Sequence, residues 1–191
     1  MGCRQLDWCV FLLLALALLV LPLQWLIAVL LAGAVHELGH YAALRICGVD
    51  VRELRIGVAG AKMSVGQMGR WQELICALAG PMAGLGFVLL ARWLPRTAVC
   101  ACIQSAYNLL PVYPLDGGRA VRCVCVSDRV CRVIEWVCLG LIALAGLYGT
   151  VILRLGFLPS AVSAFTIHRA LAGKGLAKQA SFRYNRGRNY E

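Results

Sequence analysis

The stretch WCVFLLLALALLVLPLQWLIAVLLAGAV, residues 8–35, decides the fold class of this chain. Its 28 residues carry no Asp, Glu, Lys or Arg, and residues 74–91, 97–115 and 136–153 form three further uncharged runs. A helix crosses a lipid bilayer with about 20 apolar residues. The 191-residue chain is 61% hydrophobic and only 15% charged, whereas soluble domains are about 45–50% apolar and about 25% charged. The runs therefore predict an all-α membrane protein with several spans and argue against a soluble globule.

Pro22 divides the first and longest of these apolar segments. As one helix, residues 8–44 would be about 55 Å long, which is too long for a single crossing. Proline disrupts a helix interior because it lacks an amide donor, so the segment suits two spans. We expect about six transmembrane helices, near residues 7–21, 23–46, 73–92, from 97 onward, 133–153 and 157–172.

The positions of the basic residues support this arrangement. If both termini are cytoplasmic, 16 of the 19 Lys and Arg residues lie in cytoplasmic segments, as the positive-inside rule requires. The rule explains the net charge of +10 without a nucleic-acid partner. We therefore expect a multi-pass membrane protein, with residues 1–173 as its transmembrane domain. Residues 174–191 are basic and polar, and are expected to form a disordered cytoplasmic tail.

The segment between the second and third predicted spans is not apolar enough to cross a membrane. Val51–Val58 and Ala61–Val65 contain β-branched residues and flank Ala59-Gly60. This pattern is typical of a small β-hairpin, and the alternative is an ordinary loop.

The second predicted span contains His36-Glu37-Leu38-Gly39-His40, an HExxH motif. Histidines at i and i+4 share one helix face and can bind one zinc ion, and Glu37 can take a proton from the water that the zinc activates. Ionisable residues inside a membrane span are costly and usually functional. The alternative is a polar cluster that pairs helices, but helix pairing does not require this spacing.

A catalytic zinc generally has three protein ligands, so the chain should supply a third. Asp116 is the best candidate, within the segment NLLPVYPLDGGR at residues 108–119. Two prolines and two glycines interrupt the helix around it. In helical geometry His36 lies about 20 Å and Asn108 about 17 Å beyond the starts of their spans, so the two segments reach similar depths. The alternative is that Asp116 only caps the next helix.

Three motifs in this order resemble the site-2 protease family of intramembrane zinc metalloproteases: HELGH, Ala79-Gly80-Pro81 and NLLPVYPLDGG. Within the family the chain is most similar to the six-span sporulation type, the stage IV protease that activates a sigma factor. The resemblance covers roughly residues 5–170 and implies a bacterial cell membrane as the location. It implies that His36, His40 and Asp116 bind Zn²⁺, that Glu37 is the catalytic base, and that Asn108 helps to hold the substrate.

The chain also departs from the family pattern. Met82-Ala83-Gly84 follows the Gly-Pro pair where many members carry a polar residue, so no substrate contact is expected at Gly84. Gly80 and Gly84 instead suit close helix packing. No stretch is long enough for a PDZ domain, and the tail is too short for the CBS domain of the sporulation protease, so regulation by those modules is not expected.

These observations predict an intramembrane zinc metalloendopeptidase embedded in a lipid bilayer. Its substrate would be a transmembrane or membrane-associated protein, whose cleavage would release a regulatory factor such as a sigma factor, and membrane proteins would be its regulators. One alternative is a non-catalytic membrane protein of the same fold that binds helical clients. Another is a metal or proton transporter, although this would need a second polar site that the other spans do not offer.

Overall fold

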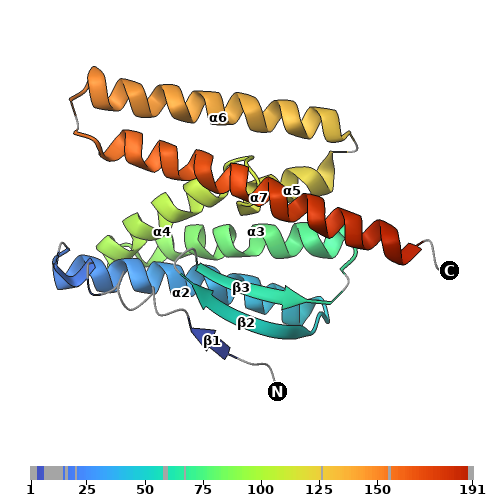
Figure 1. Ribbon diagram of the computed structural model, residues 1–191. Coiled ribbons are helices and arrows are strands. Elements are labelled where there is room, and N and C mark those ends of the chain that lie inside the picture. The colour runs from blue at the N-terminus through green and yellow to red at the C-terminus, as the bar shows by residue number, and fades with distance from the viewer. Residues whose placement is uncertain are drawn as a thin grey trace. The chain divides into compact units, whose positions relative to one another are not determined.

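The computed structural model divides the chain into two compact units, Met1–Leu109 and Leu110–Glu191. Figure 1 follows the chain from blue at the N-terminus to red at the C-terminus. The structure describes residues 4–6, 15, 17–19, 21–57, 60–66, 68–125, 127–154 and 156–188. The first predicted span, residues 7–21, lies mostly outside these ranges.

Three helices make up most of the first unit. Helix α2 is Leu23–Ile46, α3 is Arg70–Gly86 and α4 is Pro95–Asn108, and the short 3-10 helix η1, Phe87–Leu90, continues α3. Proline stands at the start of both α2 and α4, where its missing amide costs nothing because the first helical amides have no partner within the helix. The three helices pack against one another, with α2 along α3 (Figure 1).

A three-stranded sheet joins the first unit. Its strands are β1 (Arg4–Leu6), β2 (Val51–Gly57) and β3 (Gly60–Val65), in the order β1-β2-β3. β2 and β3 are antiparallel, and β1 is parallel to β2. β2 and β3 lie in the segment for which the sequence predicted a hairpin, with an ordinary loop as the alternative. The turn between them, residues 58–59, is outside the described residues and stays a prediction.

The sheet packs beside the C-terminal end of α2 and the first half of α3. A small apolar core joins them, formed by Ala43, Leu44, Val49 and Cys76, with Val51, Met63 and Val65 of the strands packed against it. Gly48 follows α2 with φ of 69°, a left-handed conformation that glycine adopts without strain, and it turns the chain from α2 toward β2. The core therefore fixes the strands next to the half of α2 that carries the HExxH motif.

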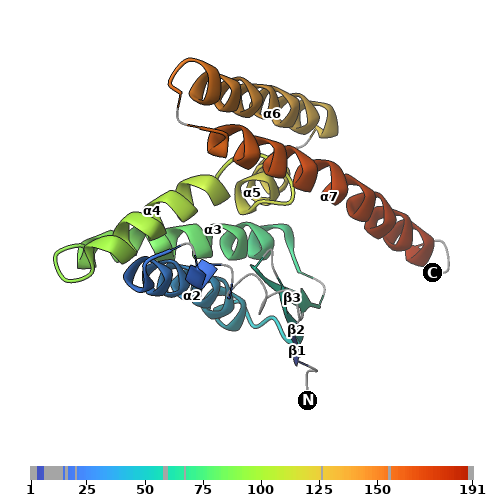
Figure 2. The ribbon, with the colours of Figure 1, turned by 60° about the vertical axis from the view of Figure 1, so that its left-hand side comes forward.

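The second unit contains α5 (Asp116–Val124), α6 (Asp128–Val151) and α7 (Leu158–Arg188). Helices α6 and α7 run side by side in both Figure 1 and Figure 2. Small residues bring them close: a Cβ at Gly149 would lie 3.1 Å from Cβ of Pro159. The Ser163 hydroxyl donates to the Ile142 carbonyl at 2.9 Å. Small residues and hydroxyl hydrogen bonds are common between membrane helices.

Within the part of the chain that the structure describes, three helices are long and apolar enough to cross a membrane: α2, α3 with η1 to Leu90, and α6. Large apolar side chains on α2 and α6 are exposed, among them Leu30, Leu31, Leu141, Leu144 and Leu147. Such surfaces suit contact with lipid rather than water. The fourth predicted span corresponds to α4, which has only 14 residues. The count of six spans stays a prediction.

Helix α7 continues to Arg188, into residues 174–188, for which the composition predicted a disordered tail. Lys, Ala, Leu and Gln are frequent in the first part of this segment. These residues are good helix formers, and they prolong a helix that has already begun at Leu158.

Candidate metal centre

The two histidines of the HExxH motif face the same point beside α2. Their spacing of four residues places both on one side of the helix. The Nε2 atoms of His36 and His40 are 3.2 Å apart, and the ring centroids are 4.7 Å apart with the rings almost perpendicular. His36 is buried, at 4% exposure, and His40 is half-buried. The helix therefore presents two imidazole nitrogens together in a largely enclosed place.

This separation fits a shared zinc ion. Two nitrogens bound at about 2.0–2.1 Å to one tetrahedral zinc lie roughly 3.3 Å apart. The observed 3.2 Å between the Nε2 atoms agrees with that value. The histidine pair can thus accept zinc without a change in the helix.

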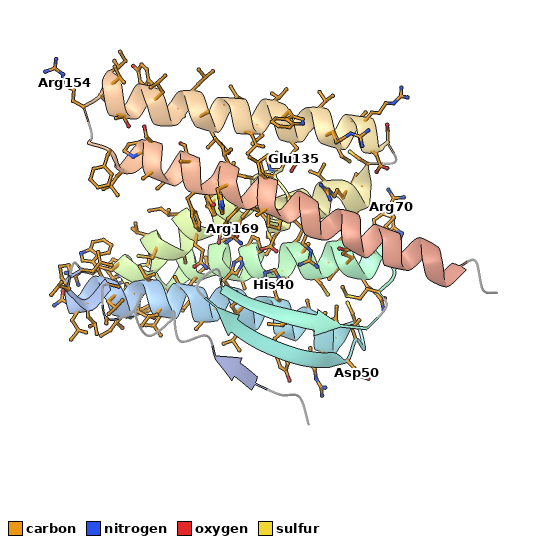
Figure 3. The ribbon with its side chains drawn as sticks, viewed as in Figure 1. His40, Asp50, Arg70, Glu135, Arg154 and Arg169 are labelled. Atoms are coloured by element: carbon orange, nitrogen blue, oxygen red, sulfur yellow. The ribbon has the colours of Figure 1, made fainter. Side chains whose placement is uncertain are left out.

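A main-chain contact fixes the orientation of His40. Its Nδ1–H donates to the carbonyl oxygen of Cys76 on α3 at 2.7 Å. Because a carbonyl can only accept, Nδ1 must carry the proton, and in the neutral ring Nε2 then offers its lone pair. Metal-binding histidines generally have such a contact, which sets the tautomer and the ring position. Figure 3 labels His40 on α2.

Two glycines allow α2 and α3 to approach at this point. A Cβ at Gly39, inside the motif, would lie 2.6 Å from the Ala79 carbonyl oxygen, which real Cβ atoms do not tolerate. A Cβ at Gly80 would collide with the imidazole ring of His40. The close packing expected at Gly80 and Gly84 is confirmed, since a Cβ at Gly84 would meet the Ser105 hydroxyl of α4. Gly80 in addition makes room for a proposed zinc ligand.

Glu37 follows His36 on α2 and is half-buried. The helix places it beside the histidine pair, because consecutive residues are rotated by about 100° around the helix axis. Asn108 is the last residue of α4, and its Nδ2 donates to the Gln104 carbonyl at 3.1 Å. That bond holds the amide at the point where the chain leaves the helix.

Asp116 belongs to the second unit, where it is the first residue of α5. It is buried, at 8% exposure, and its carboxylate lies 3.8 Å from the Arg119 guanidinium one turn later. An acidic residue in the first turn of a helix is favoured by the backbone dipole. The N-cap of α5 is Leu115, so Asp116 does not cap the helix as the alternative expected, and its favourable place in the first turn remains as the structural role beside that of a ligand.

Sequence reasoning missed two features of this centre. The carbonyl of Cys76 has no sequence signal, because any residue could supply a main-chain oxygen. Gly39 does have one: a glycine in the middle of an otherwise good helix costs stability and so indicates close approach of a neighbour.

Part of the chain is similar in sequence to proteins named as zinc metalloproteases. The chain is 26% identical over 103 residues to a zinc metalloprotease of Methanocaldococcus jannaschii, which is 47% of this chain and 30% of the relative. It is 32% identical over 119 residues to Rip3 of Mycobacterium tuberculosis, also named as a zinc metalloprotease, with 51% of this chain and 29% of the relative matched. The match thus spans less than a third of the length of these relatives. No protein-family model matches the chain.

A solved structure extends the likeness to most of the chain. The site-2 protease from Methanocaldococcus jannaschii superposes with a TM-score of 0.61, at 18% identity, over 89% of each chain. At this identity the superposition shows a shared fold. The relatives found by sequence are thus named as zinc metalloproteases, and the chain shares the fold of a site-2 protease. These likenesses support zinc as the metal.

Proposed function

We propose that this protein is an intramembrane zinc metalloendopeptidase, which cleaves a peptide bond in a transmembrane or membrane-associated protein. One observation carries the proposal. On a helix apolar enough to span a membrane, His36 and His40 hold their Nε2 atoms 3.2 Å apart with a glutamate between them in sequence. Each such charge or imidazole inside a span is costly, which argues for a function.

We propose that His36, His40 and Asp116 are the three protein ligands of the zinc. Together they offer two imidazole nitrogens and one carboxylate oxygen. Three ligands of these types leave a fourth position open, as in catalytic zinc sites generally. When bound there, zinc would polarise the scissile carbonyl and make water a stronger nucleophile near neutral pH.

The side chains of this chain would then do the following. Glu37 takes a proton from the attacking water and later passes it to the leaving amine of the substrate. Asn108, held by its bond to Gln104 at the end of α4, orients the main chain of the substrate. His40 continues to donate its Nδ1–H to the Cys76 carbonyl, so its Nε2 remains free of a proton and available as a ligand.

The sheet offers a way to bind the substrate. A peptide bond in a helix is shielded by its own hydrogen bonds, so the substrate must unwind before it is cleaved. The order β1-β2-β3 places β2 in the centre and β3 at an edge. We propose that the unwound segment adds to the edge of β3, because an extended peptide can pair with a strand edge through main-chain bonds alone.

The membrane topology can be proposed from the distribution of the basic residues. We propose six spans with both termini cytoplasmic, because 16 of the 19 basic residues then lie on the cytoplasmic side. Cleavage would release a regulatory factor from the membrane, and a sigma factor is the kind of factor that the sporulation type releases.

The proposal is tested by cleavage of a model transmembrane substrate in reconstituted vesicles. Without a general base, Glu37→Gln should slow cleavage about 10²- to 10⁴-fold. Asp116→Asn should also lower cleavage, because the amide is a weaker ligand than the carboxylate. Cleavage by Glu37→Gln at the rate of the unchanged protein would exclude the proposed role of Glu37.

A further inference from the structure

The loop of residues 110–115, which leads to Asp116, folds back on the first turn of α5. The Leu115 amide donates to the Val112 carbonyl at 2.9 Å. A Cβ at Gly118 would lie only 2.6 Å from the same carbonyl oxygen, so only glycine fits there. The position of this loop therefore sets where Asp116 begins its helix.

Tyr113 is the part of this loop that neighbouring helices contact. The Arg122 guanidinium of α5 lies over its ring, 4.2 Å from the ring centroid. From α7, Gly173 approaches so closely that a Cβ there would lie 3.3 Å from Cδ1 of Tyr113. A planar guanidinium over an aromatic face is attracted by the electrons of the ring. The two contacts tie the loop to two helices of its own unit.

Arg122 is in turn held by a carboxylate on α6. Its Nη2 lies 3.6 Å from Oε2 of Glu135, whose side chain is only 4% exposed. Glu135 lies on a helix apolar enough to span a membrane and is labelled in Figure 3. A carboxylate buried in such a place is costly unless it has a partner. Glu135 thus orients the guanidinium that covers Tyr113.

We propose that Arg122 and Glu135 are positioning residues for the metal centre. Their ion pair fixes Arg122 over Tyr113, and this clamp of three side chains holds the loop so that Asp116 keeps the orientation of a zinc ligand. The inference rests on the proposed function of Asp116. It assigns a purpose to a buried carboxylate and an arginine that the proposed reaction does not otherwise use.

The test measures zinc affinity, by competition with a chromophoric chelator, on the full chain purified in detergent. Arg122→Gln and Glu135→Gln should each weaken zinc binding about 10- to 100-fold, the usual effect of losing a residue that orients a ligand. The double variant should bind no more weakly than the worse single variant, because the two residues act as a unit. Exposed Arg132, three residues before Glu135 on α6, is the matched control: Arg132→Gln removes the same charge and should leave zinc affinity unchanged.

Variants of Tyr113 separate positioning from simple stability. Tyr113→Phe keeps the ring under Arg122 and should retain zinc affinity, whereas Tyr113→Leu removes the ring and should weaken binding to the extent of Arg122→Gln. These variants keep the test decisive even if loss of the ion pair prevents folding. Equal zinc affinity in Tyr113→Leu and Tyr113→Phe would overturn the clamp.

Asp116→Asn in the same assay distinguishes failure of the clamp from failure of the proposed ligand set. If Asp116→Asn weakens zinc binding but Arg122→Gln and Glu135→Gln only lower thermal stability, the clamp is wrong and the proposed ligand stands. If Asp116→Asn binds zinc as the unchanged chain does, the proposed ligand set itself is wrong, and the clamp fails with it.

Discussion

The histidine half and the aspartate half of the proposed centre are built in different ways. His36 and His40 lie on an uninterrupted helix, and a main-chain carbonyl and two glycines of α2 and α3 fix their place. Asp116 follows an irregular loop, which Arg122 of α5 and Gly173 of α7 contact, and Glu135 of α6 pairs with Arg122. The first half depends on helix geometry and close backbone packing. The second depends on side-chain contacts, from Tyr113 to Arg122 and from Arg122 to Glu135.

The largest effect should come from the histidine half. His40→Ala removes a proposed ligand that already faces its partner at 3.2 Å, so zinc binding and cleavage should both fall to background. The chain offers a matched control, because His168 is exposed on α7 and His168→Ala should change neither. If zinc content were equal in the two variants, the histidine pair would not be the metal site.

A smaller effect should follow from filling the contact between α2 and α3. Gly80→Ala forces a Cβ into the His40 ring, and such overpacking typically costs about 1–3 kcal/mol. We expect lower thermal stability together with weaker zinc binding. Gly33→Ala on α2 is the control, because a Cβ there meets nothing within 4 Å, and alanine should stabilise the helix by up to about 1 kcal/mol. If Gly80→Ala changed neither thermal stability nor zinc binding, the ring of His40 would not be confined by Gly80.

The smallest effect should come from Asn108. Asn108→Ala should raise KM for a model substrate by about 10-fold or less with little change in kcat, because it removes binding that ground state and transition state share. Zinc content should not change. Gln104→Ala, one turn earlier on α4, is the control, since Asn108 donates to the main-chain carbonyl of this residue, which alanine keeps. A fall in zinc content in Asn108→Ala would point to a structural role instead.

How far a feature could be predicted from the sequence depends on whether it is local. The second predicted span, residues 23–46, matches α2 at both ends, because Pro22 marks its start and Gly48 follows its end. The pairing of His36 with His40 follows from helical spacing alone. These features are local, and helix periodicity is enough to predict them.

The remaining features could not be predicted because they are not local. Nothing near Arg122 indicates that its partner is Glu135 on the next helix, rather than a residue one turn away. The contact of His40 with the Cys76 carbonyl depends on how α2 and α3 pack. The division of the chain after Leu109 falls inside one uncharged run, residues 97–115. Pro111 and Pro114 indicate that the helix breaks there, but they do not indicate a boundary between two compact units.

Zinc content and cleavage can be determined on the same preparation of Glu37→Gln, which separates metal binding from catalysis. Glu37 is proposed to move protons and not to bind the metal. We therefore expect one zinc per chain, as in the unchanged protein, together with loss of nearly all cleavage. Full cleavage by this variant, or an unchanged protein that folds and carries no zinc, would contradict the account.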